Sequence, residues 1–179
     1  TRGKRSMTLD MRNARANDLL TRLAKSFDVI VENARPGAME ERGFGYRQAR
    51  EANPQIIWCA ITGFGQTGPY AGRPGYGAIG EAMGGLRAVI GEPDRPPARA
   101  GISIGDTLAA TFACLGALMS LHARERTGKG QVVDSAIYEA VLNMMESLVT
   151  EYDKAGYVRE RTGAILPNVA PSNVYKTSD

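Results

Sequence analysis

Apolar positions in the first third of the chain alternate between helical spacing and short β-branched runs. The apolar residues of segment 14–27 recur every three or four positions, which predicts an amphipathic helix. The runs 28–31 and 55–62 have the length and composition of buried strands. Residues 46–52 predict a short helix between them, and the alternation over residues 6–11 is a weak signal for another strand.

The pattern changes after the second apolar run. Segment 63–105 is rich in glycine and proline and predicts loops, with one short helix over 78–86. From Leu108 to Met119, apolar residues recur at helical spacing with alanines on the other faces, so we expect a helix that is apolar nearly all round and deeply buried. A short strand over 131–133 and one continuous helix over 137–155 complete the prediction.

Strands that alternate with helices in this way are typical of a parallel α/β unit. The sequence therefore predicts a Rossmann-like parallel sheet with flanking helices. A chain of 179 residues is long enough for one domain with a substantial core. The chain begins without Met and ends at Asp179 without a capping pattern, so we expect it to be truncated at both ends.

Composition narrows the range of functions. The net charge of +3 comes from scattered basic residues, a pattern that does not indicate nucleic-acid binding. No uninterrupted apolar run reaches the roughly 18 residues of a membrane span, so we expect no membrane partner. Cys59 and Cys114 lie in apolar runs and His122 is the only histidine, which favours free thiols in the cytoplasm over a zinc site.

One glycine motif has the spacing of a dinucleotide fingerprint but lacks its context. Residues 63–68 read GFGQTG directly after a predicted strand. A fingerprint also requires a helix that opens within the loop and faces the pyrophosphate with its N-terminus. Pro69, Gly72 and Pro74 follow at once and prevent such a helix. We therefore do not expect a nicotinamide or flavin nucleotide at this loop.

Several short stretches together resemble the class III coenzyme A (CoA) transferases, the CaiB/BaiF family, which also includes formyl-CoA transferase and α-methylacyl-CoA racemase. The resemblance implies that residues 1–179 are the CoA-binding and catalytic segment of the family's large domain, with the rest of the N-terminal unit and a small domain outside this chain. It also implies an interlocked homodimer. The matching stretches are Gly3–Ser6 with Leu9-Asp10, Val31–Asn33 with Arg35–Gly37, Asn53-Pro54, Gly63–Tyr70, Gly101–Asp106 and Arg126–Gln131.

The resemblance implies that an aspartate attacks an acyl-CoA thioester and carries first the acyl group and then CoA. Asp106 occupies the matching position. It follows Gly105 and precedes the apolar helix predicted from Thr107, where the helix dipole favours an ionised and therefore nucleophilic carboxylate. Without the motif, the simplest interpretation of Asp106 would be a helix cap, and we assign only that role to Asp134.

The resemblance also implies a set of binding residues, with CoA as a substrate and no tightly bound cofactor or metal. Guanidinium groups near strand ends suit the phosphates of CoA. Family members commonly have an aromatic residue where this chain has Ala34. The expected contacts to the nucleotide part are Asn33, Arg35 and Arg42, with Leu9 and Arg12 on the adenine side and Tyr76 in the substrate pocket.

Two other functions fit the same resemblance. A racemase uses a histidine–aspartate pair, but the position of that histidine is Tyr76 here, and His122 lies four helical turns beyond Asp106. A catalytically silent CoA-binding subunit is the second alternative. Many transferases have an acidic residue directly after the tyrosine, where this chain has Gly77.

The donor and acceptor acids are not indicated by the motifs. Three arginines in the loop before Asp106 are candidates for a second carboxylate of a dicarboxylic substrate. They are Arg87, Arg95 and Arg99.

Overall fold

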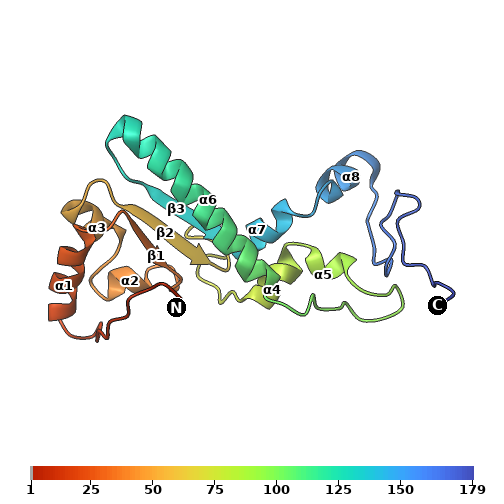
Figure 1. The fold of residues 1–179 in the computed structure, drawn as a ribbon, viewed down its shortest axis with the longest axis horizontal. Coiled ribbons are helices and arrows are strands. Elements are labelled where there is room, and N and C mark those ends of the chain that lie inside the picture. Colours follow the sequence, from red (N-terminus) through yellow and green to blue (C-terminus); the bar gives the residue numbers. More distant parts are fainter. Residues whose placement is uncertain (1) are drawn as a thin grey trace.

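A computed structural model describes residues 2–179 as a three-stranded parallel sheet with helices around it (Figure 1). The strand order is β1-β2-β3, and all pairings are parallel. The predicted Rossmann-like class, a parallel sheet flanked by helices, is confirmed. The elements are α1 (Arg15–Ala24), β1 (Val29–Glu32), α2 (Ala38–Glu41), α3 (Tyr46–Ala52), β2 (Ile57–Thr62), α4 (Gly77–Met83), α5 (Leu86–Val89), α6 (Ile104–Thr127), β3 (Val132–Ala136), α7 (Ile137–Asn143) and α8 (Leu148–Ala155).

The central strand β2 separates two hydrophobic cores. Trp58 and Ala60 face a core that α1 and α3 complete, whereas Ile61 packs against a core formed by α6 and α7. This division follows from the alternation of side chains along a strand. Because both faces of β2 are covered, its sequence is a nearly continuous apolar run.

Two motifs that carried the family resemblance hold the sheet and its helices together. The Asn53 side-chain amide donates hydrogen bonds of 3.1 Å to the carbonyls of Ala24 and Phe27, which ties the end of α3 to the end of α1. Gly130 passes so close to the chain before β2 that an added Cβ would lie 1.9 Å from the Ile56 carbonyl oxygen. Both motifs therefore have structural roles in this segment.

Helix α6 packs on the sheet through its small residues. An added Cβ at Gly116 would lie 2.6 Å from Val133 Cγ1, so only glycine lets the helix and β3 approach this closely. The prediction of a helix buried all round is wrong, because within residues 2–179 the sheet, α4 and α7 cover only part of its surface. Leu115, Leu118 and Met119 are exposed. The buried residues of α6 are Gly105, Ala109, Ala113 and Ser120.

By length and composition alone, α6 also qualifies as a membrane-spanning helix. Its most apolar stretch has a mean hydropathy of 1.5, and 22% of that stretch is buried. A single helix of this kind is weak evidence, since core helices of soluble proteins have similar compositions. The expectation of no membrane partner therefore stays a prediction.

Three further expectations need correction. Residues 6–11 form no strand, and no segment within residues 2–179 pairs with the free edge of β1. The continuous helix expected over 137–155 is interrupted by residues 144–147, where Glu146 adopts a left-handed backbone with φ of 52°. Helix α6 begins three residues earlier than predicted, so Asp106 lies within its first turn.

Candidate active site

The largest cavity near the sheet lies where parallel α/β sheets usually bind ligands, beyond the carboxyl ends of the strands. Its volume is about 670 Å³. The loops after β1 and β2, the start of α4 and the first turns of α6 surround it. It brings together four of the residues expected to bind CoA, line the substrate pocket or react, which are Asn33, Arg35, Tyr76 and Asp106. Arg99, one of the three arginines considered for a second carboxylate, also lines it.

Asp106 is positioned by the tight contact between α4 and α6. Its side chain is exposed to the cavity, while the preceding Gly105 is buried. An added Cβ at Gly105 would lie 3.0 Å from Ile137 Cγ2 and 3.3 Å from the Gly77 carbonyl oxygen. The absence of a side chain at this position therefore allows the first turn of α6 to approach α4 and places the Asp106 carboxylate at the cavity wall.

Gly77 provides the space that the carboxylate occupies. An added Cβ at Gly77 would lie 2.6 Å from Asp106 Oδ2 and 3.0 Å from its Cγ. Both distances are shorter than an ordinary van der Waals contact. The lack of a side chain at position 77 therefore has a structural role of its own, because no side chain fits here while Asp106 keeps its orientation. Sequence reasoning noted Gly77 but did not predict this contact.

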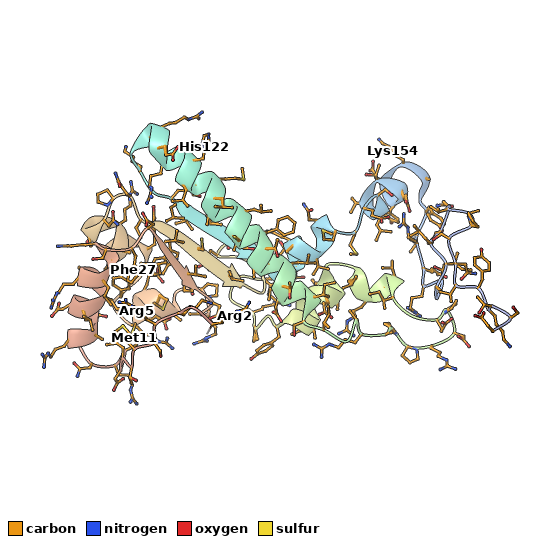
Figure 2. All side chains as sticks on the ribbon, viewed as in Figure 1. Arg2, Arg5, Met11, Phe27, His122 and Lys154 are labelled. Carbon is orange, nitrogen blue, oxygen red and sulfur yellow. The ribbon has the colours of Figure 1, made fainter. Side chains whose placement is uncertain are left out.

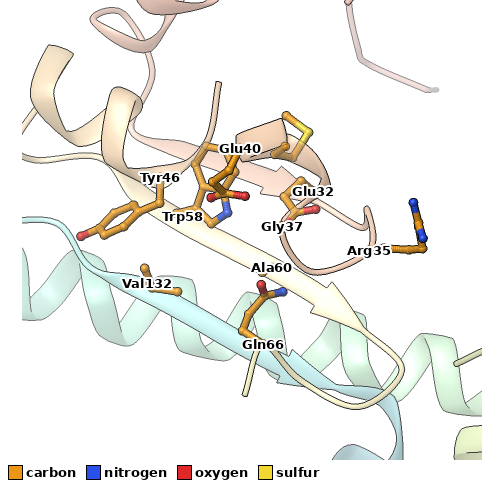
Figure 3. A pocket seen from close by; sticks show the side chains of 10 residues that line it. Glu32, Arg35, Gly37, Glu40, Tyr46, Trp58, Ala60, Gln66 and Val132 are labelled. Carbon is orange, nitrogen blue, oxygen red and sulfur yellow. The ribbon is translucent and has the colours of Figure 1, made fainter. Parts of the chain in front are cut away.

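The loop after β1 contributes Asn33 and Arg35 to the lining of the cavity. Glu32 Oε2 accepts a 2.7 Å hydrogen bond from the Ala34 N–H and thereby shapes the turn. Burial raises the pKa of the Glu32 carboxyl. A second, smaller cavity of about 200 Å³ lies beside this loop, and Figure 3 shows Arg35 projecting away from Trp58 at its edge. Arg35 lines both cavities.

Three predicted CoA contacts lie outside the main cavity. Arg42 is exposed at the C-terminal end of α2, and Leu9 lines a separate cavity of about 480 Å³ beside α1. Arg12 is exposed, and its Nε lies 3.0 Å from Asp10 Oδ1. The structure thus does not gather these residues with Asp106, and their roles stay predictions.

The glycine loop after β2 forms another wall of the cavity. Two of its amides form hydrogen bonds within the protein: the Gly65 N–H donates to Thr62 Oγ1 at 2.9 Å, and the Gln66 N–H donates to Asp134 Oδ2 at 2.8 Å. Asp134 lies within β3 and anchors this loop, so its assignment as a helix cap is wrong. The next helix along the chain begins only at Gly77, so this loop does not itself open into a helix as a dinucleotide fingerprint requires.

His122 lies at the far end of α6 from Asp106 (Figure 2). Sixteen residues of helix separate the two positions by about 24 Å. Its side chain is exposed, and its Nδ1 lies 3.9 Å from Glu125 Oε2. Among residues 2–179, no three histidine, cysteine or acidic side chains are grouped so that they could hold a metal ion.

A model of CoA-transferase family III matches residues 1–179. The chain belongs to this family. A solved CaiB/BaiF family protein from Brucella suis has the same fold, with a TM-score of 0.91 and 37% sequence identity over 98% of this chain and 47% of that one.

Curated proteins similar to this chain are named as CoA-transferases. The chain is 57% identical to the succinyl-CoA–D-citramalate CoA-transferase of Chloroflexus aurantiacus, over 99% of this chain and 44% of the relative. It is 35% identical to the acetyl-CoA:oxalate CoA-transferase of Acetobacter aceti, over 99% of this chain and 46% of the relative. The family III chain thus spans less than half the length of these relatives.

Proposed function

We propose that the protein containing this chain transfers CoA between an acyl-CoA thioester and a carboxylic acid, with Asp106 as the covalent carrier. One observation carries the proposal. The carboxylate expected to react, Asp106, lines the same cavity as Asn33 and Arg35, which are expected to hold CoA. Membership of a CoA-transferase family supports the reaction class.

In the proposed reaction, the Asp106 carboxylate attacks the thioester carbonyl. The C–S bond breaks, CoA leaves as a thiolate, and a mixed anhydride forms. The thiolate then attacks the aspartyl carbonyl, which releases the donor acid and leaves an aspartyl-CoA thioester. The acceptor carboxylate displaces CoA to form a second anhydride, and the thiolate attacks its acyl carbon to give the new thioester and restore Asp106.

The same cavity supports this role over proton abstraction. A racemase would need a second base beside Asp106, and the residue that matches the racemase histidine is Tyr76, which lines the same cavity. The position of His122 at the other end of α6 leaves it too far away to serve. Exchange of deuterium at the substrate α-carbon without any change of acyl partner would instead favour the racemase.

Replacement of the carboxylate tests the proposal in the full-length protein. Succinyl-CoA and citramalate are suitable trial substrates, because a relative 57% identical to this chain is named for them. Asp106→Asn should lower the transfer rate by on the order of 1,000-fold or more, as loss of a covalent nucleophile does, without weakening CoA binding in calorimetry. Asp94→Asn, in the exposed loop before α6, is the matched control. Transfer at the wild-type rate by Asp106→Asn would refute the proposal, and a wild-type protein that binds CoA but transfers nothing would be the silent subunit.

We further propose a cytoplasmic homodimer. The alternative is an assembly of two different chains. It arises because two other relatives, from Chloroflexus aurantiacus, are named as the alpha and beta subunits of succinyl-CoA–L-malate CoA-transferase, with identities of 36% and 37%. Light scattering of the purified full-length protein separates the cases. A dimer of one chain supports the proposal, whereas a protein that is stable only with a second, different chain contradicts it.

A further inference from the structure

The charges around the main cavity are unbalanced. Its charged lining side chains are Arg35, Arg73, Arg99 and Asp106, three cations against one carboxylate. The proposed function assigns Arg35 to the CoA phosphates. Two guanidinium groups, those of Arg73 and Arg99, therefore remain in the cavity that also contains Tyr76 and the nucleophile.

The structure narrows the set of arginines that sequence reasoning suggested for a second carboxylate. Arg87 is paired with the fully buried Glu81, with its Nε and Nη2 both 3.0 Å from Oε2, so its charge is already neutralised. Arg95 does not line the cavity, whereas Arg99 does. Arg73, which the sequence did not single out because it lies in a Gly-Arg-Pro loop, joins it there.

Arg73 is held in place by an aromatic stack. Its guanidinium carbon lies 4.4 Å from the centroid of the Tyr70 ring, and the Tyr70 ring lies 5.6 Å from that of the buried Phe64. A cation on an aromatic face loses little freedom when it binds an anion, and the planar guanidinium suits a carboxylate. Among residues 2–179, neither Arg73 nor Arg99 forms a salt bridge with an acidic side chain.

We propose that Arg73 and Arg99 bind the second carboxylate of a dicarboxylic acyl group and so make this site selective for dicarboxylic substrates. The inference rests on the proposed function, because it needs the acyl end of the thioester beside Asp106. A monocarboxylic acyl group of the same length would leave both guanidinium groups without an anionic partner. Discrimination then arises from charge-assisted hydrogen bonds that only the dicarboxylic group can accept.

The direct test compares succinyl-CoA with butyryl-CoA, which has a methyl group in place of the carboxylate. In the full-length protein, Arg99→Gln and Arg73→Gln should each lower the ratio of the two kcat/KM values by roughly 10- to 150-fold, which is the worth of one charge-assisted hydrogen bond. Arg95→Gln, in the same loop but outside the cavity, should leave the ratio unchanged. An unchanged ratio in both cavity variants would overturn the proposal, even if kcat/KM fell for both substrates by the same factor.

A binding measurement separates this inference from the proposed function. The thioether analogues of succinyl-CoA and butyryl-CoA, with a methylene in place of the thioester carbonyl, cannot react. Calorimetry should show that wild-type protein binds the carboxylate-bearing analogue more tightly and that Arg99→Gln reduces this preference. Equal affinity of the wild type for both analogues rejects the inference whether or not transfer occurs. A preference for the carboxylate-bearing analogue without any CoA transfer would reject only the proposed function.

Discussion

The close approach of Gly77 to Asp106 predicts that one added methyl group, in Gly77→Ala, will lower the rate of CoA transfer and leave the free energy of unfolding nearly unchanged. In Gly77→Ala the new Cβ would lie 2.6 Å from Asp106 Oδ2, and an ordinary contact begins at 3.4 Å. The carboxylate must therefore move by about 0.8 Å, a rotation of roughly 25° about χ1 that costs about 0.5–1.5 kcal/mol. A displacement of this size at a reacting atom lowers the rate by up to about 100-fold. We expect kcat/KM for CoA transfer to fall about 10- to 100-fold.

Stability should respond differently. Gly77 is the first residue of α4 and its φ is not positive, so alanine fits the backbone and gains up to about 1 kcal/mol over glycine in a helix. This gain offsets the strain at Asp106, and we expect the free energy of unfolding to change by less than about 1 kcal/mol. Gly72→Ala, with no atom within 4 Å of its new Cβ, is the control for both measurements. Wild-type kcat/KM in Gly77→Ala would refute the idea that Asp106 reacts in this orientation.

Three further predictions concern the scaffold that holds the site. Asn53→Ala leaves two backbone carbonyls without their donor and should lower the free energy of unfolding by about 1–3 kcal/mol in urea titrations, and a loss below about 0.5 kcal/mol would contradict this role. Gly130→Ala forces the backbone away from the Ile56 carbonyl and should destabilise by about 1–3 kcal/mol or more, so unchanged thermal unfolding would be inconsistent with the close approach. Burial raises the folded-state pKa of Glu32 above its ordinary 4.5, so the folded protein holds this proton to higher pH than the unfolded chain and stability falls as the pH rises through 4.5. Glu32→Gln should remove that part of the pH dependence, and identical pH profiles for variant and wild type would show that the carboxyl is not perturbed.

The elements with strong local patterns could be predicted from the sequence, whereas contacts between distant segments could not. The periodicity that predicts α1 and α3 and the apolar run that predicts β2 reflect burial along a single element. The exposure of Leu118 depends on what covers α6, which the pattern of one helix does not contain. Asp134 looks like a helix cap locally, but its partner Gln66 belongs to a loop far away in the sequence.

The candidate site shows the same division. The motifs around Asn33, Arg35 and Asp106 indicated residues that the fold brings to one cavity. The presence of Arg73 in that cavity depends on how a glycine- and proline-rich loop returns to the sheet, and such a loop carries no periodic signal. The role of Gly77 depends on the approach of two helices, which is set by packing between them.

Trapping of the covalent intermediate tests whether Asp106 is the residue that carries the acyl group and CoA. The full-length protein would be incubated with succinyl-CoA and hydroxylamine, digested, and its peptides sequenced by mass spectrometry. We predict a hydroxamate on the side chain of Asp106 that requires the acyl-CoA and is missing from Asp106→Asn. A protein that transfers CoA at its full rate while Asp106 stays unmodified, or that carries the hydroxamate on another residue, would contradict this prediction.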